Sequence, residues 1–370
     1  MCELKKCYCK KCLMKSGDPG VVIKSDGLCN QCSGDEIKGA VENIKKIIAE
    51  AMEFEDFLNT ERDKNAYDCL LMLSGGKDSI NMLDQMVNKY NAKVLAFSIN
   101  HPFESNLALK NIELCISKLN VEHIMFTPNI NDYKQILGRV FNMDHGQSTS
   151  CGSRATYKTP CILCTAFMQL KSYLFAAKLG IPYILYCADP FQMSHIQKDM
   201  QLVIKDLIAL LGDKCEEIFG SDFSILKNPD WNKLPKIIYP YALVDNYNPD
   251  VIVDTLKKKG LYSGSPIETH CSLYSLLNYY SYKNFDMNFY APEIAYDVRI
   301  GKLNRTNAIE YAECFKKIIL ETALKNNITE EDKAFILHTI RLLYENEQQV
   351  NFIYDKILNL KKIMKDFHVK

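Results

Sequence analysis

Apolar residues along the middle of the chain follow two alternating spacings. Residues 69–73 are a short apolar run typical of a buried strand, and residues 80–90 carry apolar side chains at helical spacing. The alternation of strand and helix continues over residues 93–100, 106–119, 122–127, 165–179 and 181–187. It predicts an α/β fold, in which a Rossmann-like parallel sheet is covered by helices on both faces.

Four segments are expected from this pattern. Residues 1–35 are rich in cysteine and turn residues, and residues 36–66 have the apolar spacing of a linker helix. The α/β domain is expected over residues 67–245, and residues 246–370 are expected to be mainly helical. In this last segment, Thr329–Asp332 has the composition of a helix start.

A glycine-containing turn connects the first strand to its helix, with the sequence Ser-Gly-Gly-Lys-Asp-Ser. The two glycines allow a tight turn and the close approach of a ligand. The amides at the start of the helix favour an anion, and the serine and lysine side chains add donors and positive charge. A plain turn is the alternative, but this combination predicts a pocket for phosphate or pyrophosphate. The pocket residues are Ser74, Gly75, Gly76, Lys77, Asp78 and Ser79.

This strand, turn and helix resemble the PP-loop of the N-type ATP pyrophosphatases, whose fold is HUP-like. The resemblance implies that ATP is cleaved between its α and β phosphates. AMP is then attached to a carbonyl or amide oxygen of a second substrate, and a nitrogen or sulfur nucleophile displaces it. Lys77 is expected to stabilise the departing pyrophosphate, and Asp78 to help hold Mg²⁺. Adenine is expected near Ser98 and Asn100, and Asp189 is expected to orient the acceptor or a proton.

Two cysteine pairs near the N-terminus have the spacing of a metal site. Cys9 and Cys12 are separated by sixteen residues from Cys29 and Cys32, and turn residues lie between the pairs. Two thiolate pairs on tight turns complete a tetrahedral Zn²⁺ site, and so short a segment could hardly fold without the metal. We therefore predict a structural zinc ribbon, with four unliganded thiols as the alternative.

A further pair, Cys161 and Cys164, is predicted at the N-terminus of a helix. The helix dipole lowers the pKa of a thiol at that position, so these thiolates could bind metal or act as nucleophiles. The residues leave three specific interpretations of this pair open: a second zinc site, a redox pair that forms a persulfide, and two buried thiols.

Two family resemblances bear on the reaction. Over most of its length the chain resembles the bacterial N-acetyl sugar amidotransferases of surface-polysaccharide and nonulosonic-acid pathways. The matching stretches are the cysteine-rich leader, the loop at 74–79, Ser-Ile-Asn-His-Pro-Phe at 98–103 and Val-Arg-Ile-Gly-Lys-Leu at 298–303. This resemblance implies that ammonia from a partner glutaminase forms an amidine on an activated acetamido group.

In the active site the chain resembles instead the tRNA thiolation enzymes that make 2-thiocytidine and 2-thiouridine. The likeness lies in Pro-Cys-Ile-Leu-Cys at 160–164, the helix behind it, and residues 239–271. It implies a [4Fe-4S] cluster held by Cys161, Cys164 and Cys271, with its fourth iron left open to carry sulfide. Cys151 is the alternative third ligand.

The site decides the reaction on a shared scaffold. We therefore predict an ATP-dependent adenylating transferase that replaces an oxygen of its acceptor with sulfur. The ammonia-dependent amidotransferase is the alternative. A nucleotide-sensing module that holds ATP without cleaving it is the third option.

Composition limits the partners. The formal net charge is zero, which does not favour a long nucleic-acid footprint. We expect the acceptor to be a small molecule, a sugar or a nucleoside; tRNA is possible but less favoured. No apolar run could span a bilayer and no signal-peptide pattern is seen, so we expect a cytoplasmic protein without a membrane contact. A sulfur donor or a glutaminase subunit would be the protein partner, and a homodimer is an open option.

Overall fold

A five-stranded sheet lies at the centre of the chain, in the order β3-β2-β1-β4-β5, with every neighbouring pair parallel. The strands are β1 (Cys69–Met72), β2 (Val94–Ile99), β3 (Glu122–Phe126), β4 (Tyr183–Leu185) and β5 (Lys236–Ile238). The predicted α/β fold with a parallel sheet is confirmed. The computed structural model describes residues 7–34, 37–60, 65–101, 103–142, 159–189, 234–244, 247–264 and 271–369.

The inner strands β1, β2 and β4 are apolar because both faces of the sheet are buried there. All six residues of β2 are buried, which is typical of parallel sheets covered by helices. Successive side chains point to opposite faces, so Leu70 and Phe97 join one hydrophobic core while Leu71 and Ala96 join another.

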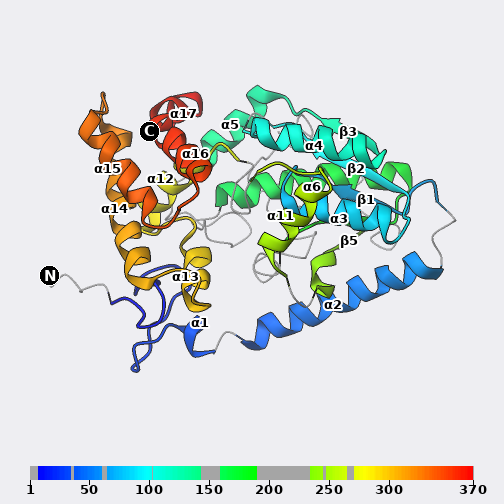
Figure 1. Ribbon diagram of the computed structural model, residues 1–370, viewed down its shortest axis with the longest axis horizontal. Coiled ribbons are helices and arrows are strands. Elements are labelled where there is room, and N and C mark those ends of the chain that lie inside the picture. The colour runs from blue at the N-terminus through cyan, green and yellow to red at the C-terminus, as the bar shows by residue number, and fades with distance from the viewer. Residues whose placement is uncertain are drawn as a thin grey trace.

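Helices cover both faces of the sheet (Figure 1). On the side of Leu71, α3 (Lys77–Asn88) contacts β1 and β2, and α11 (Pro249–Lys258) packs against α3. The long helix α2 (Ile37–Thr60) contacts β5, and its Phe54 ring lies 5.1 Å from the ring of Tyr183. On the other side, α6 (Thr159–Leu179) contacts β1 and β4. The remaining helices of this half are α4 (Asn106–Leu119), α5 (Ile130–Phe141) and the short 3-10 helix η4 (Pro240–Leu243).

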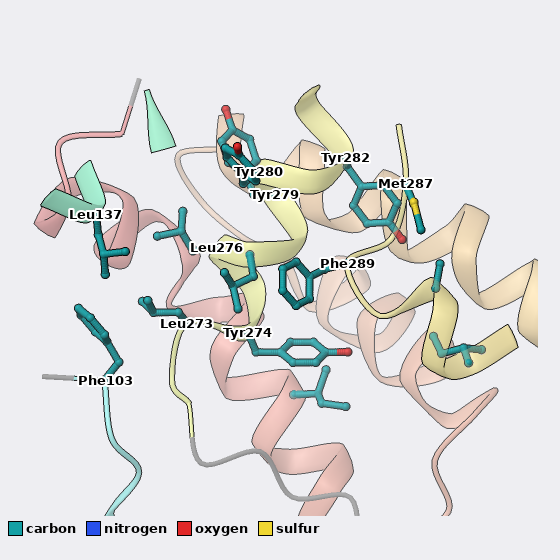
Figure 2. Close-up of a cluster of buried hydrophobic side chains, with 14 of the residues drawn as sticks. Phe103, Leu137, Leu273, Tyr274, Leu276, Tyr279, Tyr280, Tyr282, Met287 and Phe289 are labelled. Atoms are coloured by element: carbon teal, nitrogen blue, oxygen red, sulfur yellow. The ribbon is translucent and has the colours of Figure 1, made fainter. Parts of the chain in front are cut away.

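The last hundred residues form the helical region that the sequence predicts. Its helices are α12 (Tyr274–Phe285), α13 (Ala291–Arg299), α14 (Arg305–Leu324), α15 (Glu330–Arg341), α16 (Glu347–Leu358) and α17 (Leu360–Asp366). At the predicted helix start, Thr329 and Asp332 form a reciprocal capping box. Figure 2 shows Phe103 and Leu137 beside Leu273 at the start of α12, so this region and the α/β half share one core.

The N-terminal segment packs on these helices rather than on the sheet (Figure 1). It contains the short helix α1 (Asn30–Ser33) and two isolated antiparallel bridges, Tyr8 with Lys15 and Ile23 with Cys29. The Arg305 side chain donates hydrogen bonds to the carbonyl oxygens of Cys9 and Cys12. The helix α2 then carries the chain from this segment to the sheet.

Two boundaries differ from the sequence pattern. Helix α3 begins at Lys77, three residues before its apolar spacing starts, because Gly76 is the N-cap residue and Asp78 complements the helix dipole in the first turn. Strand β4 is only three residues long. Within the described part of the chain, no helix combines the length and apolarity that crossing a membrane would require.

Candidate active site

The turn between β1 and α3 has the shape that its glycines predict. Gly75 adopts a φ of +73°, a conformation that costs little only for glycine. A Cβ atom there would lie 2.3 Å from the carbonyl oxygen of Ala108, so α4 leaves no room for a side chain. The turn is therefore held tightly against the first turn of α4.

The two serines of the turn close it by hydrogen bonding. The Ser79 hydroxyl donates to the Gly76 carbonyl at 3.0 Å and accepts from the Ser74 amide at 3.2 Å. The Ser74 hydroxyl oxygen lies 3.2 Å from that of Ser79 and accepts from the Gly76 amide at 3.4 Å. A compact turn at a helix N-terminus with two hydroxyl groups is a suitable cradle for phosphate.

Asp78 is held from both sides. Lys77 donates to one carboxylate oxygen at 2.7 Å, and the Tyr247 hydroxyl donates to the other at 2.8 Å. The Tyr241 hydroxyl donates to the Asp78 carbonyl at 3.0 Å. Burial, followed by the negative charges of Asp78 and Asp189, raises the pKa of Tyr247. The carboxylates of Asp78 and Asp189 therefore act on the same phenol, and such a pair suits Mg²⁺ next to phosphates.

The predicted adenine-binding residues lie at the end of β2. The Ser98 side chain is buried, and its hydroxyl donates to the Leu73 carbonyl at 2.6 Å and contacts His123 Nε2 at 2.9 Å. The Asn100 amide donates to the Phe126 carbonyl at 2.9 Å. Because the Ser98 hydroxyl is engaged within the sheet, any contact of Ser98 with adenine would come from its backbone.

Asn111 is a supporting residue that the sequence analysis missed. It is buried on α4, donates to the Gly75 carbonyl at 3.2 Å and exchanges hydrogen bonds with the backbone of Ser263. It thereby connects the turn between β1 and α3, here called the phosphate turn (residues 74–79), to a segment 152 residues away. The available signal was a polar residue on the buried face of α4, beside Ala108, Ile112 and Cys115.

The three candidate cluster ligands come together around Tyr133. The Tyr133 hydroxyl lies 2.7 Å from the Cys164 sulfur. Burial raises the Tyr133 pKa, and the charges of Cys164, Cys271 and Cys161 raise it further, so all three thiols lie near this one phenol. Cys161 is exposed at the start of α6, and Cys164 is partly buried. Cys151 lies outside the described residues.

The thiol chemistry differs from the expectation for a helix N-terminus. Burial raises the pKa of Cys164 to about 12, and the neighbouring charges of Cys161 and Glu104 add to the effect. Burial likewise raises the pKa of Cys271. The prediction of a lowered thiol pKa is therefore wrong for Cys164, because burial outweighs the helix dipole. Without a metal group, a buried thiol stays protonated and inert.

A buried contact between a histidine and a carboxylate lies next to these thiols, and the sequence analysis did not predict it. His101 Nε2 is 3.0 Å from Glu104 Oε2, and their side chains are only 2% and 6% exposed. The backbone of Glu104 forms an antiparallel bridge with Cys271, while the His101 ring stacks on Tyr133 at 6.2 Å. The available signal was a histidine and a carboxylate three residues apart, directly after a strand.

The two sets of candidate metal-binding cysteines differ in how closely their thiols are grouped. Ligand atoms around one Zn²⁺ lie about 4 Å apart, because each Zn–S bond is about 2.3 Å long. Among the described residues, the one group of three or more ligand atoms within 4.8 Å of one another is Cys9, Cys12, Cys29 and Cys32. The thiols of Cys161, Cys164 and Cys271 are not grouped this closely, which does not suit a single Zn²⁺ but is compatible with thiolates that bind separate corners of a [4Fe-4S] cluster.

The N-terminal cysteines fit a structural zinc ion. Three of the four are fully buried, and a tetrahedral site of four thiolates is a common structural zinc site. Burial works against ionisation of Cys9, but backbone amides of Cys12, Cys29 and Lys11 outweigh it and lower the Cys9 pKa to about 6. Burial raises the Cys32 pKa to about 11. A cation bound among the four sulfurs would favour the thiolate form of each against this burial.

Fold and loop together define an α/β protein with a parallel sheet, a turn after β1 that resembles the PP-loop of the N-type ATP pyrophosphatases, a cysteine-rich N-terminal module and a helical C-terminal region. Comparison with models of known protein families found no match, and comparison with curated proteins found none either.

Several solved structures are similar to the chain at a distance. The U34-tRNA thiolase NcsA from Methanococcus maripaludis, solved with its [4Fe-4S] cluster, is 18% identical with a TM-score of 0.32, over 82% of this chain and 88% of that one. The NMN synthetase from Francisella tularensis is 14% identical with a TM-score of 0.35, over 78% and 98% of the two chains. An NH3-dependent NAD synthetase from Campylobacter jejuni is 10% identical with a TM-score of 0.29, over 59% and 84%.

Proposed function

We propose that the protein is an ATP-dependent sulfurtransferase. It activates a carbonyl or amide oxygen of its acceptor as an AMP ester, releases pyrophosphate, and replaces the activated oxygen with sulfur. The observation that carries this proposal is the convergence of Cys161, Cys164 and Cys271 on Tyr133, in a protein whose sheet also carries the phosphate turn.

The nucleotide half of the reaction uses the turn after β1. Ser74, Ser79 and the backbone amides would bind the β and γ phosphates at the N-terminus of α3, where the helix dipole favours an anion. Lys77 exchanges its contact with Asp78 for the phosphates and stabilises the charge that builds up on pyrophosphate. The freed carboxylate of Asp78, with Asp189 nearby, helps to hold Mg²⁺.

The positioning of the acceptor and ATP relative to each other supplies the rest of the catalysis of adenylation. A carbonyl oxygen of the acceptor attacks the α phosphorus, the bond from that phosphorus to the bridging oxygen breaks, and pyrophosphate departs. Holding both reactants in line is worth several kcal/mol of the barrier. Asp189, whose negative charge raises the pKa of Tyr241 and Tyr247 as that of Asp78 does, would orient the acceptor.

Cys161, Cys164 and Cys271 would hold a [4Fe-4S] cluster, which when bound supplies a site where inorganic sulfur is delivered as a nucleophile. The chain's own residues shield that site. Tyr133 covers Cys164, and Glu104 lies opposite Cys271. The aromatic and buried surroundings limit water, which would otherwise hydrolyse the AMP ester.

The remaining assignments follow from the same proposal. The acceptor would be a small molecule, a sugar or a nucleoside; tRNA is possible but is not favoured by the formal net charge of zero. A cytoplasmic location and a sulfur-donating partner protein suit a reduced cluster-bearing enzyme. The N-terminal cysteines would bind a structural Zn²⁺.

Anaerobic purification tests the proposal. We expect a brown protein with an absorbance band near ~400 nm, containing iron and acid-labile sulfide. Cys161→Ser and Cys164→Ser should lose the band, whereas Cys314→Ser, a change of a partly exposed cysteine on α14, should keep it. A colourless protein that forms an amidine from ammonia would contradict the proposal and support the amidotransferase.

The nucleotide half is tested separately by pyrophosphate release. Lys77→Ala should reduce release in the presence of acceptor by a hundredfold or more, on the order of 3 kcal/mol of transition-state stabilisation. Lys89→Ala changes a lysine just after the same helix and should have no effect. ATP that binds without any pyrophosphate release, in every acceptor mixture, would instead indicate a nucleotide sensor.

A further inference from the structure

Glu104 has an unexplained buried carboxylate oxygen. Its Oε2 pairs with His101 at 3.0 Å, but its Oε1 makes no hydrogen bond within the described part of the chain. The side chain is only 6% exposed. A buried acceptor without a partner costs about 1–3 kcal/mol, and more when it is charged, so such an atom calls for a ligand.

The backbone directs this carboxylate toward the candidate cluster site. Glu104 and Cys271 are opposite each other in an antiparallel bridge, and the Ser272 amide donates to the Phe103 carbonyl at 2.8 Å beside it. Residues directly opposite in an antiparallel pair have Cβ atoms about 5 Å apart on the same face. The carboxylate and the Cys271 thiol therefore share one side of the bridge, and Glu104 also acts electrostatically on Cys164.

We propose that Glu104 is the fourth protein ligand of the metal group at Cys161, Cys164 and Cys271, and binds it through Oε1. This inference rests on the proposed function, because it assumes a cluster at those cysteines. Three thiolates leave one iron of a [4Fe-4S] cluster without a protein ligand. Glu104 lies opposite Cys271 in the bridge, and its unpartnered oxygen is available to fill that position.

The surroundings of Glu104 match those of a ligating carboxylate. Such carboxylates are usually held by a further hydrogen bond that fixes their orientation. Here His101 binds the second oxygen, and the His101 ring is itself stacked on Tyr133 at 6.2 Å with an interplanar angle of 14°. Tyr133 thus contacts both the Cys164 thiol and His101, the partner of Glu104.

A carboxylate ligand in this position would protect the fourth iron from other ligands, but a sulfur ligand could still replace it. Carboxylate is a hard ligand, whereas iron–sulfur centres favour soft sulfur ligands. Hydrosulfide is therefore expected to displace Oε1. Glu104 would keep water and adventitious oxygen ligands away from the iron until the sulfur species arrives.

The test compares the iron sites of anaerobically reconstituted wild type and Glu104→Gln. In ⁵⁷Fe Mössbauer spectra we expect one iron of the wild-type cluster to differ from the other three, and this distinct signal to change in Glu104→Gln at unchanged iron and sulfide content. Titration with hydrosulfide should show binding at least about tenfold tighter in Glu104→Gln. The matched control is Glu113→Gln, which removes an exposed carboxylate on α4 and should behave as wild type.

A second measurement needs only the wild-type protein, so it does not depend on whether the variant folds. The reduced cluster is placed in water enriched in ¹⁷O, and hyperfine coupling to solvent oxygen is recorded. We expect no coupling, because Glu104 occupies the position. Strong ¹⁷O coupling, or identical Mössbauer spectra and hydrosulfide affinity in Glu104→Gln, would overturn the inference and leave the proposed function standing. A wild-type protein without any cluster would overturn both.

Discussion

Tyr247 donates a hydrogen bond to the Asp78 carboxylate at 2.8 Å, across 169 residues of sequence. Lys77 holds the other oxygen at 2.7 Å, and its ammonium group lies 5.9 Å from the centre of the Tyr247 ring. The phosphate turn is thus joined to the segment before α11. Asp78 has a fixed orientation before any nucleotide arrives, which reduces the cost of ordering it during binding.

Replacing Tyr247 by phenylalanine should therefore weaken the use of Mg-ATP. A hydrogen bond to a charged group contributes about 1.5–3 kcal/mol, so the KM for Mg-ATP in pyrophosphate release should rise about tenfold or more. Steady-state kinetics with varied Mg²⁺ measures this change.

The control for this variant is Tyr90→Phe. Tyr90 also donates to a carboxylate at 2.8 Å, that of Glu55, but between the end of α3 and α2. Its loss should leave the KM unchanged. Equal kinetic effects of both variants would show that Tyr247 acts through general stability alone.

Two glycines in left-handed conformations should respond very differently to alanine. At Gly180, with φ of +66° and nothing within 4 Å of a new Cβ, the substitution should cost on the order of 1 kcal/mol of unfolding free energy. At Gly75 the Cβ would also meet the Ala108 carbonyl at 2.3 Å, so Gly75→Ala should cost several times more and reduce ATP binding. Denaturant unfolding and nucleotide titration measure the two effects, and similar costs at both positions would contradict the close packing of α4.

Removal of the predicted zinc ion should loosen the N-terminal module from the C-terminal helices. Arg305 donates to the carbonyls of Cys9 and Cys12 and can do so only while the metal-binding turns keep their shape. A chelator, or Arg305→Ala, should make residues 7–34 sensitive to limited proteolysis. Arg341→Ala removes an arginine that pairs with Glu347 on the surface, and this variant should not make residues 7–34 sensitive to proteolysis. Metal analysis should find about one zinc ion per chain.

The start of α15 should show a defined acid dependence. Hydrogen bonds from Lys325 and Thr329 lower the Asp332 pKa from 3.8 to about 2. Because the folded-state pKa lies below the unfolded one, the stabilisation is complete above about pH 4 and is lost as the pH falls through about 2. The stability difference between wild type and Asp332→Asn should therefore shrink over that interval. Unfolding experiments across this pH range check it, and a constant difference would exclude the capping box as its source.

Local signals in the sequence were enough to predict the scaffold. The apolar run of β1 and the periodicity of α4 depend on burial of one face, which spacing records directly. The four N-terminal cysteines were likewise predictable, because their spacing alone matches a tetrahedral site, and their ligand atoms do lie within 4.8 Å of one another.

The parts that could not be predicted depend on pairs of residues far apart in sequence. No local pattern couples Glu104 to Cys271 or Tyr247 to Asp78, since each contact exists only after the whole chain has folded. The Cys164 pKa was mispredicted for the same reason. The helix dipole can be inferred from neighbouring residues, but the burial of the Cys164 thiol that outweighs it exists only in the folded chain.

The attachment of Arg305 to Cys12 also constrains how the protein is made on the ribosome. Cys12 emerges 293 residues before the arginine that holds its carbonyl. During translation the cysteine turns lack this hydrogen-bond partner until nearly the entire polypeptide has been made. Until then, metal or chaperones must protect them against oxidation and aggregation. If the predicted zinc ion is bound there, we expect a shortage of zinc to lower the yield of newly synthesised protein before it affects molecules that are already folded.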